Sequence, residues 1–203
     1  MSEYLMFVLP GAMYFWILFI GQGPMQDILQ EKERHILPRI LASPVTVEQY
    51  VCAKMLRCFV LCSLATVLLI VTSALLFGIK WGPPPKLALV VVIWSGSMTG
   101  LMALIYGLAR TREQANVISP LVLMVFAMLG GSMFPYENLP KFLQLVGQYT
   151  PNRWAVLAML GVVRSKPWTE LVAPVAALLA LGGLGSLLAI LLFRRQLGAE
   201  PSK

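Results

Sequence analysis

Residues 30–54 read QEKERHILPRILASPVTVEQYVCAK and lie between two long apolar segments. This stretch holds three acidic residues, four basic residues and the single histidine of the sequence. The whole chain, by contrast, is 58% hydrophobic and 12% charged, with a mean hydropathy of +0.77. Soluble domains contain roughly 25% charged residues. We therefore expect a membrane protein that gathers much of its charge in one short connection between spans.

Five apolar stretches are long enough to cross a bilayer, whose hydrocarbon core of about 30 Å needs about 20 residues of helix. We predict spans at residues 4–23, 56–79, 87–109, 116–133 and 171–193. Apart from Arg57 at the edge of the second, these spans contain no Asp, Glu, His, Lys or Arg. The sequence therefore predicts an all-α polytopic membrane protein, with residues 1–203 forming a single transmembrane domain.

The charged connection, at about residues 24–46, has the pattern of an amphipathic helix. Met25, Ile28 and Leu29 recur at helical spacing on one face, and a second apolar pair, Ile36 and Leu37, can share it. Because a proline inside a helix removes a backbone hydrogen bond, we expect this helix to stop before residue 38. A helix lying on the headgroups is the alternative to a docking element.

The second span is preceded by its own helix start. Thr46-Val47-Glu48-Gln49 has the form of a capping box, which predicts a helix that begins near Val47 and continues into the span. Lys54 and Arg57 on that helix lie where basic side chains can reach the lipid headgroups. In the third span, Gly96 and Gly100 form a G-x-x-x-G pattern that can allow close helix packing.

Residues 138–163 are too polar for a further full crossing. Asn138 can cap a short helix, and a second short helix can follow Pro151. We expect two short helices that dip into the outer leaflet and return, with a sixth span as the alternative.

Basic residues predict the orientation, because short cytoplasmic loops carry an excess of Lys and Arg. The connections after the first, third and fifth spans hold ten basic residues, and the opposite side holds six. We therefore expect residues 24–46 and the C-terminus in the cytoplasm of a cell whose plasma or inner membrane holds the protein. The N-terminus is then external with nothing to anchor it, which suggests a preceding span that this chain lacks.

Several function classes do not fit these residues. A proton- or sodium-coupled transporter normally has an ionisable group at mid-membrane, and the predicted spans have none there. No catalytic residue and no metal site are predicted, because the three cysteines cluster near the second span without metal-ligand spacing. The phosphate-binding G-x-x-x-x-G-K-[ST] motif is missing, so energy from ATP would enter through a partner. The net charge of +7 lies at span ends and does not indicate nucleic acid.

Three stretches in order give a resemblance to a known family. Residues 31–54 contain an acidic-basic run, Glu31-Lys32-Glu33-Arg34, followed by Ser43-Pro44-Val45 and a lysine, Lys54. Residues 114–159 and the LLFRRQL segment at 191–197 complete the pattern. Together they resemble the type-2 export permeases of ATP-binding cassette (ABC) transporters. The departures are at His35-Ile36-Leu37, where family members have Gly-Thr-Leu or similar, and at Pro38.

The resemblance implies a coupling helix that contacts a separate ABC ATPase subunit, which would hold the ATP and Mg²⁺. No cofactor is expected in this chain. It also implies a second permease copy or paralogue, forming a dimer in the lipid bilayer. The expected coupling residues are Asp27, Glu31, Lys32, Glu33, Arg34, His35, Ile36 and Leu37. Within this helix, His35 is expected to pair with Glu31, one turn earlier.

Three functions remain open at this stage. The first is the permease subunit of an ATP-driven exporter of a hydrophobic or amphipathic solute, such as a drug or lipid-like molecule. The second is a membrane anchor for an ATPase that does not transport. The third is an independent channel or intramembrane enzyme.

Overall fold

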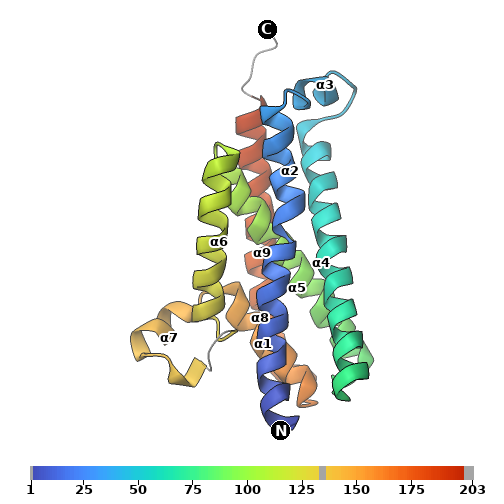
Figure 1. The fold of residues 1–203 in the computed structure, drawn as a ribbon, viewed down its shortest axis with the longest axis vertical. Coiled ribbons are helices and arrows are strands. Elements are labelled where there is room, and N and C mark those ends of the chain that lie inside the picture. Colours follow the sequence, from blue (N-terminus) through green and yellow to red (C-terminus); the bar gives the residue numbers. More distant parts are fainter. Residues whose placement is uncertain (1, 133–135, 199–203) are drawn as a thin grey trace.

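The computed structural model describes residues 2–132 and 136–198, with side chains described from residue 11 to 197 apart from residues 41 and 137. The described residues form a bundle of long helices that run roughly along its longest axis (Figure 1). The elements are α1 (Ser2–Ile20), α2 (Gln22–Glu33), α3 (Leu37–Leu41), α4 (Val47–Phe77), α5 (Pro84–Leu108), α6 (Arg112–Leu129), η1 (Tyr136–Asn138), α7 (Lys141–Gly147), α8 (Pro151–Val163) and α9 (Trp168–Gly198).

Three of these helices are long and apolar enough to span a membrane: α4, α5 and α9, within the part of the chain that the structure describes. They correspond to the predicted second, third and fifth spans. The predicted first and fourth spans correspond to the helices α1 and α6, and residue 133, the last of the predicted fourth span, lies outside the described residues. The all-helical prediction therefore holds for these elements, and the count of five spans stays a prediction.

α5 lies at the centre of the bundle. Of its most apolar 18-residue stretch, 67% is buried by the rest of the protein, compared with 22% for the same measure in α4 and in α9. Trp94 on α5 is fully buried and packs against Tyr14 of α1, with ring centroids 4.3 Å apart. Because α5 is covered on several sides and α4 and α9 on few, the outer helices carry much of the exposed apolar surface.

Glycines bring α5 and α9 together at backbone distance. A Cβ atom built on Gly100 would lie 2.3 Å from the carbonyl oxygen of Gly182, and one built on Gly182 would lie 2.6 Å from the Cα atom of Ser97. Gly185 also contacts the backbone of Gly100. Gly96, the other glycine of the G-x-x-x-G pattern, has no neighbouring atom within 4 Å of its Cβ position. The close contact therefore involves Gly100 and the glycines of α9.

Two short helices follow α6, as the sequence predicts. α7 projects sideways from the lower end of the bundle in Figure 1, and α8 packs against α9. The expected cap at Asn138 is wrong, because Asn138 ends the short η1 turn and α7 begins after Pro140. Pro140 is the N-cap residue of α7. Proline is tolerated at a helix start because the backbone amides there have no helical partner to lose.

Replacing Gly182 with alanine is expected to lower the free energy of unfolding by about 1–3 kcal/mol, because a new methyl group would overpack a backbone contact. The midpoint of thermal unfolding in detergent measures this. Gly183→Ala is the matched control, since nothing lies within 4 Å of its Cβ position. Equal midpoints for the two variants would contradict a close contact at Gly182.

Candidate coupling site where α2 meets α4

α2 is held against the bundle by an apolar face. Met25, Ile28 and Leu29 are buried at spacings of three and one, which place them on one side of the helix. α2 continues the direction of α1 and lies beside the first turns of α4 (Figure 1). Its charged residues therefore lie at one end of the bundle, beyond the apolar stretch of α4.

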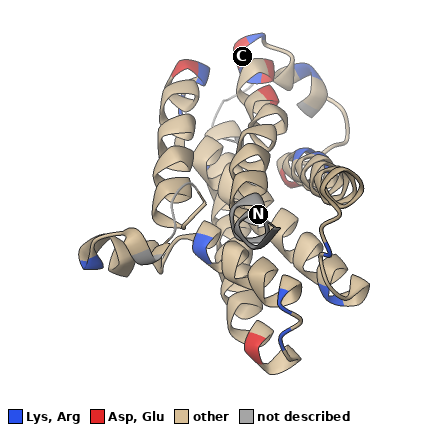
Figure 2. Cartoon of the chain, turned by 60° about the horizontal axis from the view of Figure 1, so that its bottom comes forward, with Lys and Arg blue, Asp and Glu red and all other residues tan. Residues whose placement is uncertain are grey.

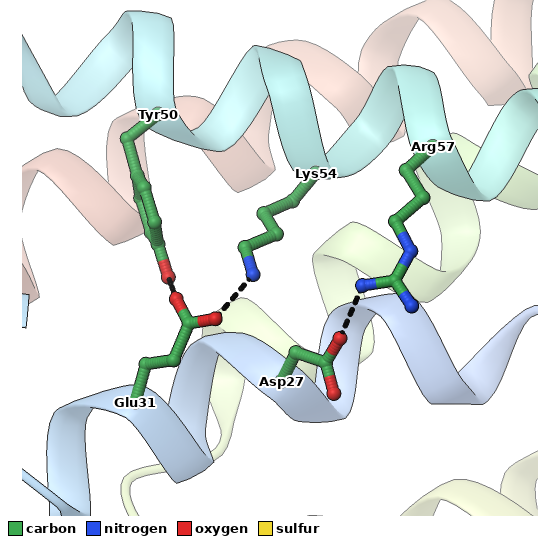
Figure 3. A network of polar contacts seen from close by, with 5 residues as sticks. All are labelled: Asp27, Glu31, Tyr50, Lys54 and Arg57. Carbon is green, nitrogen blue, oxygen red and sulfur yellow. Dashed lines mark hydrogen bonds and ion pairs between the residues drawn. The ribbon is translucent and has the colours of Figure 1, made fainter. Parts of the chain in front are cut away.

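Two carboxylates of α2 pair with three polar side chains of α4 (Figure 3). Glu31 accepts hydrogen bonds from the Tyr50 hydroxyl and from the Lys54 ammonium, the latter at 2.6 Å. Asp27 accepts one from Arg57, also at 2.6 Å. Asp27 and Glu31 are four residues apart, and Tyr50, Lys54 and Arg57 follow at spacings of four and three. Both sets therefore lie along the facing sides of two helices.

Lys54 and Arg57, which the sequence places within reach of the headgroups, are both turned toward α2 and pair with its carboxylates. The Lys54–Glu31 pair is the better shielded, with side chains 15% and 23% exposed. The Arg57–Asp27 pair is 57% and 34% exposed, so water screens it and it contributes little. The expected pairing of His35 with Glu31 is wrong, because the Glu31 carboxylate contacts Tyr50 and Lys54.

The pKa of Glu31 lies below its ordinary value of 4.5. Partial burial raises this pKa, but the hydrogen bonds from Lys54 and Tyr50, with the charges of Lys54 and Arg57, outweigh the effect of burial. A lowered folded pKa means that the ionised group stabilises the fold above pH 4.5, and that this stabilisation disappears as the pH falls through the folded pKa.

α2 is also fastened to α6. The Glu33 carboxylate accepts a hydrogen bond of 3.0 Å from the backbone amide of Arg112, in the first turn of α6. Gln26 donates its side-chain amide to the Asn116 side chain at 2.8 Å. An acidic group at a helix N-terminus also interacts favourably with the helix dipole. α2 is therefore connected by polar contacts to both of its neighbours, α4 and α6.

α4 begins at Val47, where the sequence predicts a helix start. The Thr46 hydroxyl accepts a hydrogen bond from the amide of Gln49 at 3.2 Å, and the Gln49 side chain accepts one from the amide of Thr46 at 3.0 Å. Both halves of the predicted capping box are therefore present. This fixed start places Tyr50, Lys54 and Arg57 on the side of α4 that faces α2.

α2 ends earlier than predicted: the expected helix ran up to Leu37, just before Pro38, but the observed helix stops at Glu33. The amide of Ile36 donates to the carbonyl of Glu31, and the amide of His35 donates to the carbonyl of Lys32. These two bonds form a Schellman motif, in which His35 takes the left-handed conformation with φ of 54°. The chain then enters α3, with Pro38 in its first turn.

The predicted coupling residues thus divide into two groups. Asp27, Glu31 and Glu33 contact α4 or α6, and Leu37 is buried. Arg34, His35 and Ile36 are exposed at the tip, and Lys32 is partly exposed. A shallow cleft of about 220 Å³ on this surface is lined by Asp27, Gln30, Glu31, Arg34 and Ile36. The sequence did not predict the contacts made by Gln26, Tyr50, Arg112 and Asn116, because nothing in their local pattern indicates a partner.

Among the described residues, no group of three or more His, Cys, Asp and Glu side chains could hold a metal ion. This end of the bundle offers a polar helix held between two helices, with an exposed tip. Such a geometry suits a contact with another protein.

Apolar spanning helices and a charged helix at one end of the bundle define the class as a helical membrane protein. The chain belongs to the ABC-2 family of transporter proteins, whose family model matches residues 1–192. The linearmycin resistance permease protein LnrN of Bacillus subtilis (strain 168) is 24% identical over 153 residues. That match covers 75% of this chain and 40% of the length of the relative. The search of solved structures found no match.

Glu31→Gln is expected to lower the free energy of unfolding at neutral pH by about 1 kcal/mol, because it removes a charge-assisted hydrogen bond from a partly buried pair. The loss of wild-type stability below pH 4.5 should be smaller in this variant. Thermal unfolding in detergent between neutral pH and pH 3 measures both effects. Glu113→Gln, at an exposed carboxylate, is the control. A pH profile that Glu31→Gln leaves unchanged would contradict the argument.

His35→Gly is expected to raise the free energy of unfolding by about 1 kcal/mol, because glycine adopts a positive φ without steric cost. His35→Ala should give no such gain, since alanine keeps the Cβ atom that disfavours this conformation. The midpoints of thermal unfolding of the wild type and the two variants measure these changes. Stabilisation by alanine as large as that by glycine would exclude a left-handed residue here.

Proposed function

We propose that this chain is the permease subunit of an ATP-driven exporter. A separate ABC ATPase subunit, which binds ATP and Mg²⁺, supplies the energy, and a second permease copy or paralogue completes the pathway. The cargo is a hydrophobic or amphipathic solute, a drug or lipid-like molecule, that leaves the cell. Membership of the ABC-2 family supports the transport role and the ATPase partner.

The observation that carries the proposal is the attachment of α2. A helix that receives force from a partner must be connected to the helices that line a pathway. α2 is connected to α4 through Glu31 and Lys54 at 2.6 Å, and to α6 through Glu33 and Arg112 at 3.0 Å. Movement of its exposed tip is then transmitted to two helices at once, and not lost in a free loop.

The partner contact is proposed at the exposed tip and the adjoining cleft. Arg34, His35 and Ile36 offer a basic, a polar and an apolar group within three residues. Interfaces of this kind combine an apolar anchor with a polar rim. The 40% exposed side chain of Ile36 is the proposed anchor. Under the proposed orientation this tip, and the C-terminus beyond α9, lie in the cytoplasm.

The side of the second permease is proposed along α6. Val117, Leu121, Met124 and Met128 are all exposed by 40% or more and follow at spacings of four, three and four. They form a continuous apolar stripe along one face of the helix. The described part of the chain leaves this stripe uncovered, so it is available to a second permease or to lipid.

The nature of the cargo is supported by the lining that the spans can offer. α4 beyond Arg57, α5 beyond Lys86 and α9 between Glu170 and Arg194 contain no charged side chain. A charged solute would need compensating charges at mid-membrane. The related permease from B. subtilis carries linearmycin resistance in its name. Export of a toxic amphipathic compound is in keeping with both observations.

Co-purification followed by transport measurement tests the function. The chain, expressed in its own cell with an affinity tag, should retain an ABC ATPase in mild detergent. In liposomes, hydrophobic solutes should stimulate ATP hydrolysis by that complex. An ATPase that is retained but never stimulated would indicate an anchor without transport. A chain that retains none and still conducts or cleaves would indicate an independent channel or enzyme.

Arg34→Glu combined with Ile36→Asp is expected to reduce the recovered ATPase at least tenfold, since the change alters both the charge and the apolar anchor of the tip. The thermal midpoint should stay unchanged, because both side chains are exposed. Lys141→Glu at the other end of the bundle is the control for charge reversal. Full ATPase recovery with the double variant would place the contact elsewhere.

A further inference from the structure

A second surface feature lies between α4, α5 and α9, and none of its lining residues belongs to α2. It is a groove of about 340 Å³ with almost wholly apolar walls. Phe59 comes from α4, Val92 and Gly96 from α5, and Leu179 and Gly183 from α9. Gly96 and Gly183 have no atom within 4 Å of their Cβ positions, so the missing side chains leave its floor open.

The two glycines on the floor of the groove lie midway along their helices. Gly96 lies twelve residues after Pro84, the first residue of α5, and twelve before Leu108, the last. Gly183 is similarly central in α9 (Trp168–Gly198). At mid-depth the surroundings of a lipid-facing groove are the ends of acyl chains.

One end of the same seam carries basic side chains. The Lys86 ammonium lies 5.2 Å from the centre of the Trp168 ring and donates a hydrogen bond of 2.5 Å to the carbonyl of Lys166. Lys80 and Arg164 are exposed on the two adjoining turns. Figure 2, with this end of the bundle forward, shows basic segments on neighbouring turns and little acid beside them.

The two adjoining turns are in direct contact. A Cβ atom built on Gly82, between α4 and α5, would lie 2.3 Å from the carbonyl oxygen of Val162, at the end of α8. Glu170 is the one acidic residue among the described residues of these turns, and it pairs with Lys166 at 2.7 Å. The ammonium of Lys86 and the exposed charges of Lys80 and Arg164 are thus left without a carboxylate among the described residues.

The basic end and the groove are one acyl chain apart. Ten residues of helix separate Lys86 from Gly96, which is about 15 Å, or half of a hydrocarbon core of about 30 Å. The surface between them is continuous, because Trp168, Val172 and Leu179 are exposed by 50%, 63% and 56% on the side of α9 that carries Gly183. A phospholipid whose phosphate binds at Lys86 would therefore place the end of one acyl chain in the groove.

We propose that this seam is a binding site for one anionic phospholipid of the leaflet at the Lys86 end of the bundle. Lys86, with Lys80 and Arg164 beside it, binds the phosphate, and Trp168 lies at the level of the glycerol backbone. One acyl chain follows the α5–α9 seam and ends over Gly96 and Gly183. The site does not depend on the proposed transport function, and it lies apart from the contacts of α2.

Charge and length favour a lipid over a transmembrane helix from another chain as the occupant. A helix would fill the glycine-floored groove but has no need for unpaired cations at its end. An anionic lipid accounts for both, since each basic residue near a membrane surface strengthens anionic lipid binding about fivefold.

Native mass spectrometry of the purified complex in mild detergent tests the site. Phosphatidylglycerol and phosphatidylcholine with identical acyl chains are added separately, and retention of the first bound molecule is compared. The wild type should retain phosphatidylglycerol several-fold better. Lys86→Gln should reduce that preference about fivefold. Lys86 also donates a hydrogen bond to the Lys166 carbonyl, so its replacement could disturb the fold. Lys80→Gln changes an exposed side chain and tests the same lipid preference without that contact. Lys141→Gln, a basic residue at the same end on α7, should have no effect.

A separate variant tests the part of the site that is proposed to bind the acyl chain. Gly183→Leu fills the groove without a backbone clash, since its Cβ position is open. This variant should retain both lipids several-fold less well, and Leu184→Phe on the adjacent exposed position should behave as the wild type. Equal retention of the two lipids by the wild type would overturn the proposal, as would unchanged retention in Gly183→Leu. A change in oligomeric mass without a change in lipid would assign the groove to a protein helix.

Discussion

The low polarity of the bilayer interior is the constraint on which this arrangement depends. A charge is costly at mid-membrane, and the ion pairs between α2 and α4 lie outside the apolar stretch of α4. Glu31 meets Lys54 there, and Asp27 meets Arg57. The better shielded pair, Glu31–Lys54, therefore helps to hold α2 level with the first turns of α4.

How far the sequence predicts this structure depends on the range of each interaction. The capping box at Thr46 needs only four consecutive residues, and it was predicted correctly. The end of α2 was not, because a Schellman motif is recognised by glycine and this one uses His35. The chain ends α8 in the same way with Ser165, again without glycine. A strained residue of this kind leaves no signal in composition or periodicity.

Longer-range features were harder to predict. The run of charges in residues 27–34 marked α2 as polar, but its partners lie 19 to 90 residues away. Lys54 could equally reach lipid or a carboxylate until the packing of α2 on α4 was known. Likewise, a G-x-x-x-G pattern does not say which glycine meets a neighbour. Gly100 meets α9, and Gly96 faces the groove.

The glycine contact between α5 and α9 has a mechanical consequence. The two backbones lie so close at Gly100 and Gly182 that no Cβ atom would fit between them, which leaves little room for one helix to rotate on the other. This contact favours movement of the two helices as one unit. Contacts through longer side chains, such as those of α2 with α4 and α6, leave more room for adjustment because side chains can change rotamer.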